Sequence, residues 1–460
     1  MDLDDFVAKP FLERRARFAQ RLAGLPCLLP AGSARARNYK GNPFPFRASS
    51  HFLYLFGLPL EGAFGLFDGR QWSVFAHPPD ADSALWHGPL PALADLARAL
   101  GCPVQPIADL ARSLPPKTAT IASTAHETCE AQSELLGRAI KPGTAEAVDH
   151  PLIDTMIDLR LRHDGAAIAE LRLAAEATAA AHAAGMRATR PGLREDAVRA
   201  AMEGALMTRG MTVAYSSIVT VHGEVLHNNH YHHPMRAGDL LLVDVGAETP
   251  GGWAGDVTRT WPVSGQYSST QRDIYDVVLA AQKATVAGAK PGVRYRDLHT
   301  LAASKLAEGL VALGILRGDP QELVADGVIY LLFPHGIGHL LGLDVHDMED
   351  LGDRAGYLPG RARPGEFGIR YLRLDRDLEP GMAVTIEPGL YVVPAILEDP
   401  ALTEKAKGRL DRQRLAAFSD VRGIRIEDDV LVVAGGDGHE VLTKAIPKER
   451  AAIEAAMATV

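Results

Sequence analysis

Cysteine is scarce in this sequence, and the three that occur, Cys27, Cys102 and Cys129, show no CxxC spacing. An odd number of separated thiols argues against a disulfide framework and favours buried thiols in a reducing compartment. No apolar run approaches the roughly 20 residues that a membrane-spanning helix needs. The acidic opening of the chain lacks the apolar stretch of a secretory signal. We therefore expect a cytoplasmic protein without a membrane partner.

An excess of basic residues is also missing. The 460 residues include 48 Lys and Arg against 57 Asp and Glu, so the formal net charge is −9. A nucleic-acid partner normally needs a basic face, and the composition argues against such a partner. Apolar residues at 47% and charged residues at 23% are ordinary for a globular protein, while the length exceeds what one core usually serves. Two domains are expected.

The first domain is predicted to cover residues 1–150. An amphipathic pattern over residues 11–23 predicts a helix, and the apolar run from Ser50 to Gly57 predicts a strand that ends in a glycine turn. Further strand-like and helical runs alternate beyond these two segments. Such alternation predicts an α/β domain.

The second domain is predicted to cover residues 151–460. It opens with a long Ala- and Leu-rich stretch that predicts one or two helices, broken near residues 163–165. Two later helix pairs follow Pro-Gly loops at 191–192 and 291–292, and each pair is associated with a pair of strands. This arrangement hints at an internal duplication. Residues 395–418 are polar and helical in pattern, and they are interpreted as a surface insertion.

The clearest chemical signal is an aspartate inside an apolar run. In the segment 241–248 (LLVDVGAE), Asp244 stands where another Val or Leu would be expected. The turn 249–252 (TPGG) then leads into a returning strand that carries Asp256, which is compatible with a hairpin presenting both carboxylates on one face. Two buried carboxylates repel each other unless a cation lies between them. The alternative, two turn-flanking aspartates in solvent, is disfavoured by the apolar flanks.

Three more polar residues interrupt apolar runs: His339 in HGIGHLLGLDVHD, Glu387 in TIEPGLY and Glu427 in GIRIEDD. Alone, such a histidine is often structural and such a glutamate often faces solvent. Together with the two aspartates they form a set of four carboxylates and one imidazole, which suits divalent Mn, Co, Fe or Zn. Two such ions about 3.5–4 Å apart can share a bridging water and clamp a carbonyl, so the set predicts metal-assisted hydrolysis.

The motifs VDVGAE, GDVTRTWPV, HGIGHLLGLDVHD, TIEPGLY and GIRIEDD occur in the same order in the "pita-bread" metallopeptidases. The chain thus resembles the family of methionine aminopeptidase, aminopeptidase P and prolidase. The resemblance implies an α+β pita-bread catalytic domain and two divalent ions, manganese first, with cobalt, zinc or iron as alternatives. It implies that Asp244 holds one ion, that Asp256 and Glu427 bridge both, and that His339 and Glu387 hold the other.

The resemblance also implies roles around the metal site. Glu387 would assist proton transfer, and Thr258 would place a hydroxyl behind the ligands. His335 and His346 match histidines that contact the substrate and shuttle protons. His227 and Arg425 match further substrate-binding positions.

The first domain narrows the resemblance. The segments 13–15 (ERR), 45–47 (PFR), 50–57 (SHFLYLFG) and 85–88 (LWHG) resemble the N-terminal domain of aminopeptidase P and prolidase, which methionine aminopeptidase lacks. This implies a homodimer that cleaves the bond before proline in dipeptides or short peptides, where a restricted tertiary amide needs a dedicated pocket. One departure is that the 249–252 turn is one residue longer than in these relatives.

Arg373 bears on the substrate. It falls where prolidases carry an arginine for the free carboxylate of a dipeptide, and the 395–418 insertion is also similar to prolidases. We therefore favour a dipeptidase slightly over an aminopeptidase P. The alternative for Arg373 is a surface arginine in a charged run. Trp86 is interpreted either as reaching a neighbouring subunit's site or as a plain core residue.

Proteins of similar fold include members with other functions. The fold is similar to creatine-hydrolysing and sulfonium-lyase enzymes, and to metal-free binding modules. Members without metals lose ligand positions, whereas all five are present in this sequence. A binding or scaffolding role therefore remains a remote alternative, which a metal titration would test.

Overall fold

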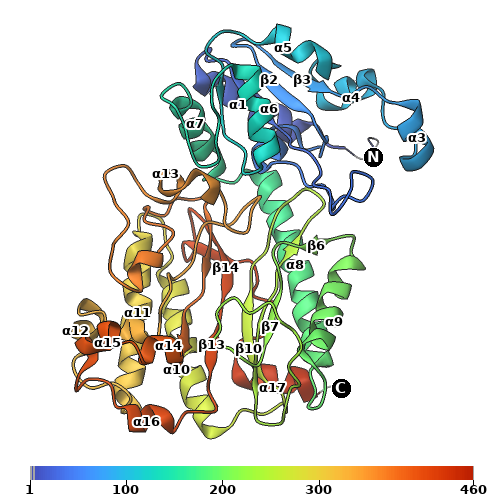
Figure 1. Ribbon diagram of the computed structural model, residues 1–460. Helices are drawn as coiled ribbons and strands as arrows, with labels where there is room; N and C mark the ends of the chain where they lie inside the picture. The colour runs from blue at the N-terminus through green and yellow to red at the C-terminus, as the bar shows by residue number, and fades with distance from the viewer. Residues whose placement is uncertain (1–2, 4–5, 459–460) are drawn as a thin grey trace. The chain divides into compact units, whose positions relative to one another are not determined.

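The computed structural model describes residue 3 and residues 6–458, so most of the acidic opening lies outside the described residues (Figure 1). The chain forms two compact units. One contains the residues up to Arg160 together with Asp350–Gly352, and the other contains Leu161–Glu349 and the residues from Asp353 onwards.

The first unit is built on a five-stranded mixed sheet with the order β4-β3-β2-β1-β5. Strands β1–β2 and β2–β3 pair antiparallel, while β1–β5 and β3–β4 pair parallel. Helices and strands alternate along this unit, as an α/β domain requires. Its elements are α1 (Lys9–Leu22), β1 (Cys27–Pro30), α2 (Ser50–Phe56), β2 (Phe64–Phe67), β3 (Trp72–Ala76), α3 (Ala81–His87), α4 (Leu93–Leu100), β4 (Val104–Pro106), η1 (Ile107–Asp109), α5 (Leu110–Ser113), β5 (Ala119–Thr120), α6 (His126–Leu136) and α7 (His150–Arg160).

The strand predicted for residues 50–57 is wrong, because this segment forms helix α2. Gly57 ends the helix in the left-handed conformation (φ 72°), and its N–H donates to the carbonyl of Leu53. Two buried arginines of α1 bind the carbonyls of the last turn, Arg14 that of Tyr54 and Arg15 that of Leu55. Because every residue of α2 is buried, its sequence lacks the polar face that marks a surface helix.

The second unit places its strands between two pairs of long helices, α8 with α9 and α10 with α11 (Figure 1). Its sheets have the orders β10-β8-β7, β11-β14-β15, β12-β13 and β6-β9, and their pairs are antiparallel. The long stretch after residue 151 breaks at 161–164, as predicted. The helices are α8 (Gly165–Ala188), α9 (Glu195–Met207), α10 (Ser269–Gly288), α11 (Tyr295–Ala312), α12 (Pro320–Ala325), η2 (Ile329–Leu331), α13 (Asp353–Gly356), η4 (Ile369–Tyr371), α14 (Pro394–Leu397), α15 (Pro400–Thr403), η5 (Glu404–Ala406), α16 (Arg412–Ala416) and α17 (Arg450–Ala458). The short helix η3 (Glu349–Leu351) begins at the last residue of one segment of this unit and continues into residues of the first unit. The strands are β6 (Thr212–Val213), β7 (Ile218–Thr220), β8 (Leu240–Asp244), β9 (Ala247–Glu248), β10 (Thr258–Pro262), β11 (Ala383–Ile386), β12 (Gly389–Tyr391), β13 (Gly423–Arg425), β14 (Asp428–Val432) and β15 (His439–Val441).

The two halves of the second unit repeat one local pattern. In the first Pro-Gly loop, the N–H of Gly192 donates to the carbonyl of Met235 at 2.8 Å. One hundred residues later, the N–H of Gly292 donates to the carbonyl of Leu378 at the same distance. Both glycines have positive φ, 90° and 82°. The repeated connection supports the internal duplication suggested by the sequence.

The cysteines and the helices bear on the expected thiols and on membrane crossing. Cys27 and Cys129 are buried, Cys102 is half-buried, and all three are free thiols. Among the described helices, not one combines the length and the apolar character that crossing a membrane would demand.

Candidate metal centre

The hairpin predicted from the apolar run brings two aspartates together. Asp244 is the last residue of β8, and it lies opposite Thr258 of β10, two residues beyond Asp256. The hydroxyl of Tyr215 lies 2.5 Å from Oδ1 of Asp244 and 2.6 Å from Oδ1 of Asp256. The aspartates are only 9% and 5% exposed, so the alternative of a solvent-facing pair is wrong.

The longer turn between the two aspartates forms a closed hairpin tip. The N–H of Thr249 donates to the carbonyl of Trp253 at 2.9 Å, and the N–H of Gly252 donates back to the carbonyl of Thr249 at 2.8 Å. Gly252 has a φ of 87°, a conformation that glycine adopts readily. The tip therefore accommodates its length locally, which agrees with the tolerance of hairpin ends to insertion.

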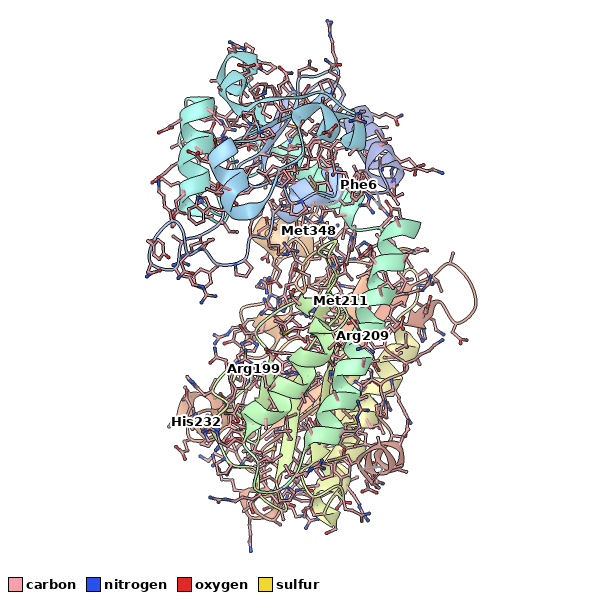
Figure 2. All side chains as sticks on the ribbon, turned by 90° about the vertical axis from the view of Figure 1, so that its right-hand side faces the viewer. Phe6, Arg199, Arg209, Met211, His232 and Met348 are labelled. Atoms are coloured by element: carbon pink, nitrogen blue, oxygen red, sulfur yellow. The ribbon has the colours of Figure 1, made fainter. Side chains whose placement is uncertain are left out.

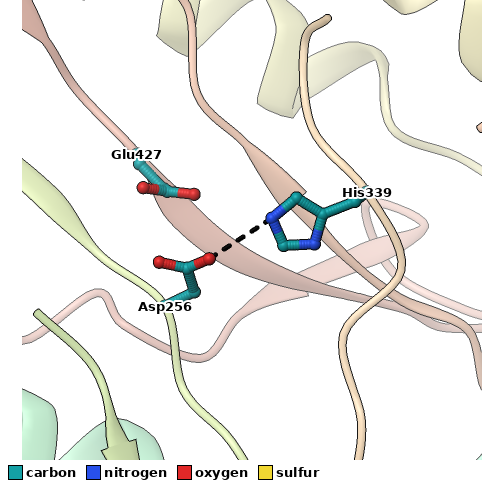
Figure 3. Close-up of side chains that lie close together, drawn as sticks. All are labelled: Asp256, His339 and Glu427. Atoms are coloured by element: carbon teal, nitrogen blue, oxygen red, sulfur yellow. Dashed lines mark ion pairs between the residues drawn. The ribbon is translucent and has the colours of Figure 1, made fainter. Parts of the chain in front are cut away.

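The other three candidates come from separate elements of the second unit. Glu387 follows β11 directly, Glu427 separates β13 from β14, and His339 lies in the loop after η2. Nε2 of His339 lies 3.3 Å from Oδ2 of Asp256 and 3.7 Å from Oε1 of Glu387. Figure 3 shows Asp256, His339 and Glu427 facing one another, and one potential ligand atom of each lies within 4.8 Å of the others.

All five candidates line one cavity of about 450 Å³ in the second unit. The same cavity is lined by each histidine and arginine that the resemblance implied for the substrate. Its remaining wall is largely apolar or backbone, which suits a peptide side chain. The predicted residues on this wall are Asp244, Asp256, His339, Glu387, Glu427, His227, His335, His346, Arg373 and Arg425.

The electrostatics of the cluster call for cations. Burial, followed by the charge of Asp244, raises the pKa of Asp256 well above its usual range. Burial and the charge of Asp256 likewise raise the pKa of Glu427, and burial raises the pKa of Glu387 to about 7. Four carboxylates are thus crowded together beside the guanidinium of Arg425, which pairs with Asp244. Divalent ions coordinated by oxygen and imidazole would resolve this crowding, and the donor set fits them.

Thr258 and Arg425 hold the carboxylates from behind. The hydroxyl of Thr258 donates to Oε2 of Glu427 at 2.7 Å and accepts from Nε of Arg425 at 2.8 Å. Nη2 of Arg425 donates to Oδ2 of Asp244 at 2.7 Å. Thr258 therefore contacts one candidate ligand, and Arg425 contacts both a candidate ligand and the cavity.

The three remaining histidines lie around the cluster in different environments. Burial lowers the pKa of His335 to about 3, and its Nε2 lies 2.9 Å from the hydroxyl of Tyr391. The ring of His346 lies 3.9 Å from the ring of His339. Burial also lowers the pKa of His346 and of His227. Neutral imidazoles can accept one proton and donate another, which suits proton transfer.

Sequence reasoning missed three residues of this site. Tyr215 joins the two aspartates, and no motif marks it in the sequence. Tyr391 was part of the TIEPGLY motif, but its hydroxyl contacts with His335 and Arg425 appear only in the fold. Glu349 binds Arg373 and His346, and it follows the HGIGHLLGLDVHD motif by only two residues.

Trp86 lies away from any core. In the first unit it occupies α3 and is 78% exposed, so its interpretation as a core residue is wrong.

With the geometry established, comparison with known proteins places the chain in a family. A profile described as metallopeptidase family M24 matches residues 169–434, and one described as the aminopeptidase P N-terminal domain matches residues 11–124. The chain therefore belongs to metallopeptidase family M24. Within it, the N-terminal domain assigns the chain to the branch of aminopeptidase P and prolidase, M24B.

Individual relatives agree with this assignment along the whole chain. Xaa-Pro aminopeptidase 2 of Streptomyces coelicolor is 32% identical over 475 residues, covering 97% of this chain and 90% of that protein. Human Xaa-Pro dipeptidase is 30% identical over 474 residues, with coverages of 97% and 93%. The structure of Pseudomonas aeruginosa aminopeptidase PepP matches with a TM-score of 0.81 at 30% identity over 98% of both chains. The predicted α/β domain followed by a pita-bread domain is confirmed.

Proposed function

We propose that this enzyme hydrolyses the bond between an N-terminal residue and a following proline in dipeptides or short peptides. The observation that carries the proposal is the single cavity lined by five potential metal ligands, three histidines and Arg373. The relatives named Xaa-Pro aminopeptidase and Xaa-Pro dipeptidase support the same substrate class. A metal-free binding role would leave four crowded carboxylates balanced mainly by the guanidinium of Arg425.

Two divalent ions are proposed for the cluster, manganese first, with cobalt, zinc or iron as alternatives. When bound, such ions supply Lewis acidity, which acidifies a water molecule and polarises the scissile carbonyl. The proposed ligands are Asp244, Asp256, His339, Glu387 and Glu427.

The surrounding side chains then handle protons and position the substrate. Glu387 takes the proton from the attacking water and passes it to the nitrogen of the leaving proline. His335 lies beside this carboxyl group, with Nδ1 3.9 Å from Oε2 of Glu387, and its Nε2 contacts the hydroxyl of Tyr391, which fixes the ring. His346 and His227 donate hydrogen bonds to the peptide. Arg425 and Thr258 keep the carboxylates of Asp244 and Glu427 in place.

Replacing Tyr215 by phenylalanine is expected to weaken metal binding about 10- to 100-fold, because the hydroxyl that holds both aspartates is lost. Equilibrium dialysis with manganese measures this change directly. Tyr231→Phe is the matched control, since the Tyr231 hydroxyl binds the carbonyl of Ser217 and touches no candidate ligand. Equal manganese affinity in the two variants would contradict the role of Tyr215.

The substrate is either an Xaa-Pro dipeptide or a longer peptide that begins with Xaa-Pro. Arg373 lines the cavity and supports a dipeptidase, because a guanidinium can bind the free carboxylate of proline. Aminopeptidase P activity is supported by a specific contact, the ion pair of Arg373 with Glu349, which already engages this guanidinium. A dipeptidase is therefore our first hypothesis, and an aminopeptidase P is the second.

A paired assay distinguishes dipeptidase activity from aminopeptidase P activity. The manganese-loaded enzyme is tested for release of proline from an Xaa-Pro dipeptide and of the first residue from an Xaa-Pro-Xaa tripeptide. Arg373→Ala is expected to lower kcat/KM for the dipeptide about 10- to 100-fold, because a charge-assisted pair to the carboxylate is lost. Tripeptide turnover that Arg373→Ala leaves unchanged would identify an aminopeptidase P. Absence of turnover with both peptides would reject the proposed function.

Three finer properties belong to the same proposal. The native metal is proposed to be manganese, which metal analysis of the purified enzyme tests. A homodimer is proposed from the resemblance to aminopeptidase P and prolidase, and sedimentation measures it. A cytoplasmic location is proposed because three free thiols and no disulfide framework fit a reducing compartment.

A further inference from the structure

The segment from His346 to Glu349 makes a constrained turn at the cavity wall. Met348, which is labelled in Figure 2, has a φ of 61°, in the left-handed region that a residue with a side chain rarely adopts. Its side chain is buried, with only 1% of its surface exposed. The neighbouring Asp347 is held by its N–H, which donates to the carbonyl of Leu340 at 3.0 Å. Such conformations persist where the surrounding structure fixes them, and they are frequent at functional sites. The turn directs Glu349 back toward His346.

Glu349 contacts both an arginine and a histidine of the cavity. Nη1 of Arg373 lies 3.0 Å from Oε1 and 2.7 Å from Oε2 of Glu349. Oε2 also lies 3.1 Å from Nδ1 of His346. Although partial burial alone would raise it, the hydrogen bond with His346 and the charge of Arg373 lower the pKa of Glu349 to about 2. Glu349 is therefore a carboxylate at neutral pH.

This pairing changes what Arg373 offers to a substrate. The carboxylate of Glu349 cancels the charge of the guanidinium and accepts hydrogen bonds from its Nη1. Within the described part of the chain, Nε and Nη2 of Arg373 have no hydrogen-bond partner, so they remain able to donate. A neutral pair with free N–H groups can bind a peptide carbonyl as well as a carboxylate, whereas an unpaired arginine would favour the carboxylate.

We propose that Glu349 is a positioning residue that sets substrate length. It holds Arg373 at the cavity wall and cancels its charge, so that peptides continuing beyond proline are accepted alongside Xaa-Pro dipeptides. This inference rests on the proposed Xaa-Pro peptidase function and deepens it. Glu349 acts through Arg373 and takes no part in proton transfer.

The test compares an Xaa-Pro dipeptide with the amide of the same dipeptide, which lacks the terminal charge. Glu349→Gln keeps the shape of the side chain and removes its charge. The ratio of kcat/KM for the dipeptide to kcat/KM for the amide is expected to rise about fivefold in this variant, mainly through a lower KM for the dipeptide. In the background of Arg373→Gln, the same change at position 349 is expected to leave the ratio unaltered. Glu349→Asp, which restores the charge, is expected to return the ratio toward that of the wild type.

A second measurement keeps this test separate from the proposed function. Calorimetry with an uncleavable dipeptide analogue, whose scissile amide is reduced, and with the corresponding amide reports the same preference without turnover. Glu404→Gln serves as the control, because Glu404 forms an ordinary exposed ion pair with Lys407 away from the cavity. A purely structural role for Glu349 would weaken both ligands equally and leave the ratio unchanged, and that result would overturn the inference. If neither peptide is turned over but the analogue ratio still shifts, the proposed reaction fails while the role of Glu349 stands.

Discussion

Replacing Asp256 by asparagine is expected to lower kcat/KM for Xaa-Pro substrates about a thousandfold, because one of the carboxylates proposed to hold the ions would be lost. The same variant is expected to be more stable than the wild type when both are metal-free. Asp256 is buried beside Asp244, and these surroundings penalise its charge, as the raised pKa of its carboxyl records. A neutral amide of similar shape removes that penalty.

These opposite effects separate a metal ligand from a structural residue. Metal content by mass spectrometry, activity and the thermal midpoint in chelator would be measured on the same preparations. Asp437→Asn is the matched control, since Asp437 is exposed and lies outside the cavity. A variant that loses stability in chelator as well as activity would indicate that Asp256 supports the fold, and the proposed ligand role would be withdrawn.

The pairing of Asp244 with Asp256 could be predicted because their flanks leave few alternatives. Leu241 to Val243 must be buried, and an aspartate that continues such a run is buried with them. A turn of Pro and Gly then returns the chain, so the second aspartate is delivered to the same face. Local sequence and global fold agree here, and for this reason the hairpin followed from sequence alone.

Other features depend on contacts that local sequence does not encode. Helix α2 has the aromatic composition of a strand. Its last carbonyls accept hydrogen bonds from the buried guanidiniums of Arg14 and Arg15, which are distant in sequence. Tyr215 reaches two aspartates that lie 29 and 41 residues away. Glu349 contacts Arg373 from a position next to Met348, whose backbone is left-handed. The positions of Tyr215 and Glu349 thus depend on contacts between distant residues and on local backbone strain, which the motifs do not encode.

Without metals, the stability of the enzyme is expected to fall as the pH rises from about 4.5 to 7. Burial raises the pKa of Glu387 from its ordinary 4.5 to about 7 in the metal-free fold. For an acid with a raised folded-state pKa, the unfolded chain releases its proton first. The contribution of this group is therefore fully present below pH 4.5 and is lost as the pH rises through 7. The loss for Glu387 alone is on the order of 3 kcal/mol, and Asp256 and Glu427 act in the same direction.

Bound ions are expected to reverse this trend, because they stabilise the ionised carboxylates and bind more tightly as protons leave. The gap between the thermal midpoints of the metal-loaded and the chelated enzyme should therefore widen by several degrees between pH 5 and pH 8. His335, whose pKa burial lowers to about 3, makes folding more favourable as the pH rises toward 6.5. His335 is present in both the metal-loaded and the chelated enzyme, so we expect its contribution to cancel when the two midpoints are subtracted. In Glu387→Gln, the difference between the two midpoints should increase less from pH 5 to pH 8 than in the wild type. In Glu404→Gln, the increase should equal that of the wild type. A gap that stays constant across this range would mean that the buried carboxylates are not the groups that hold the metals.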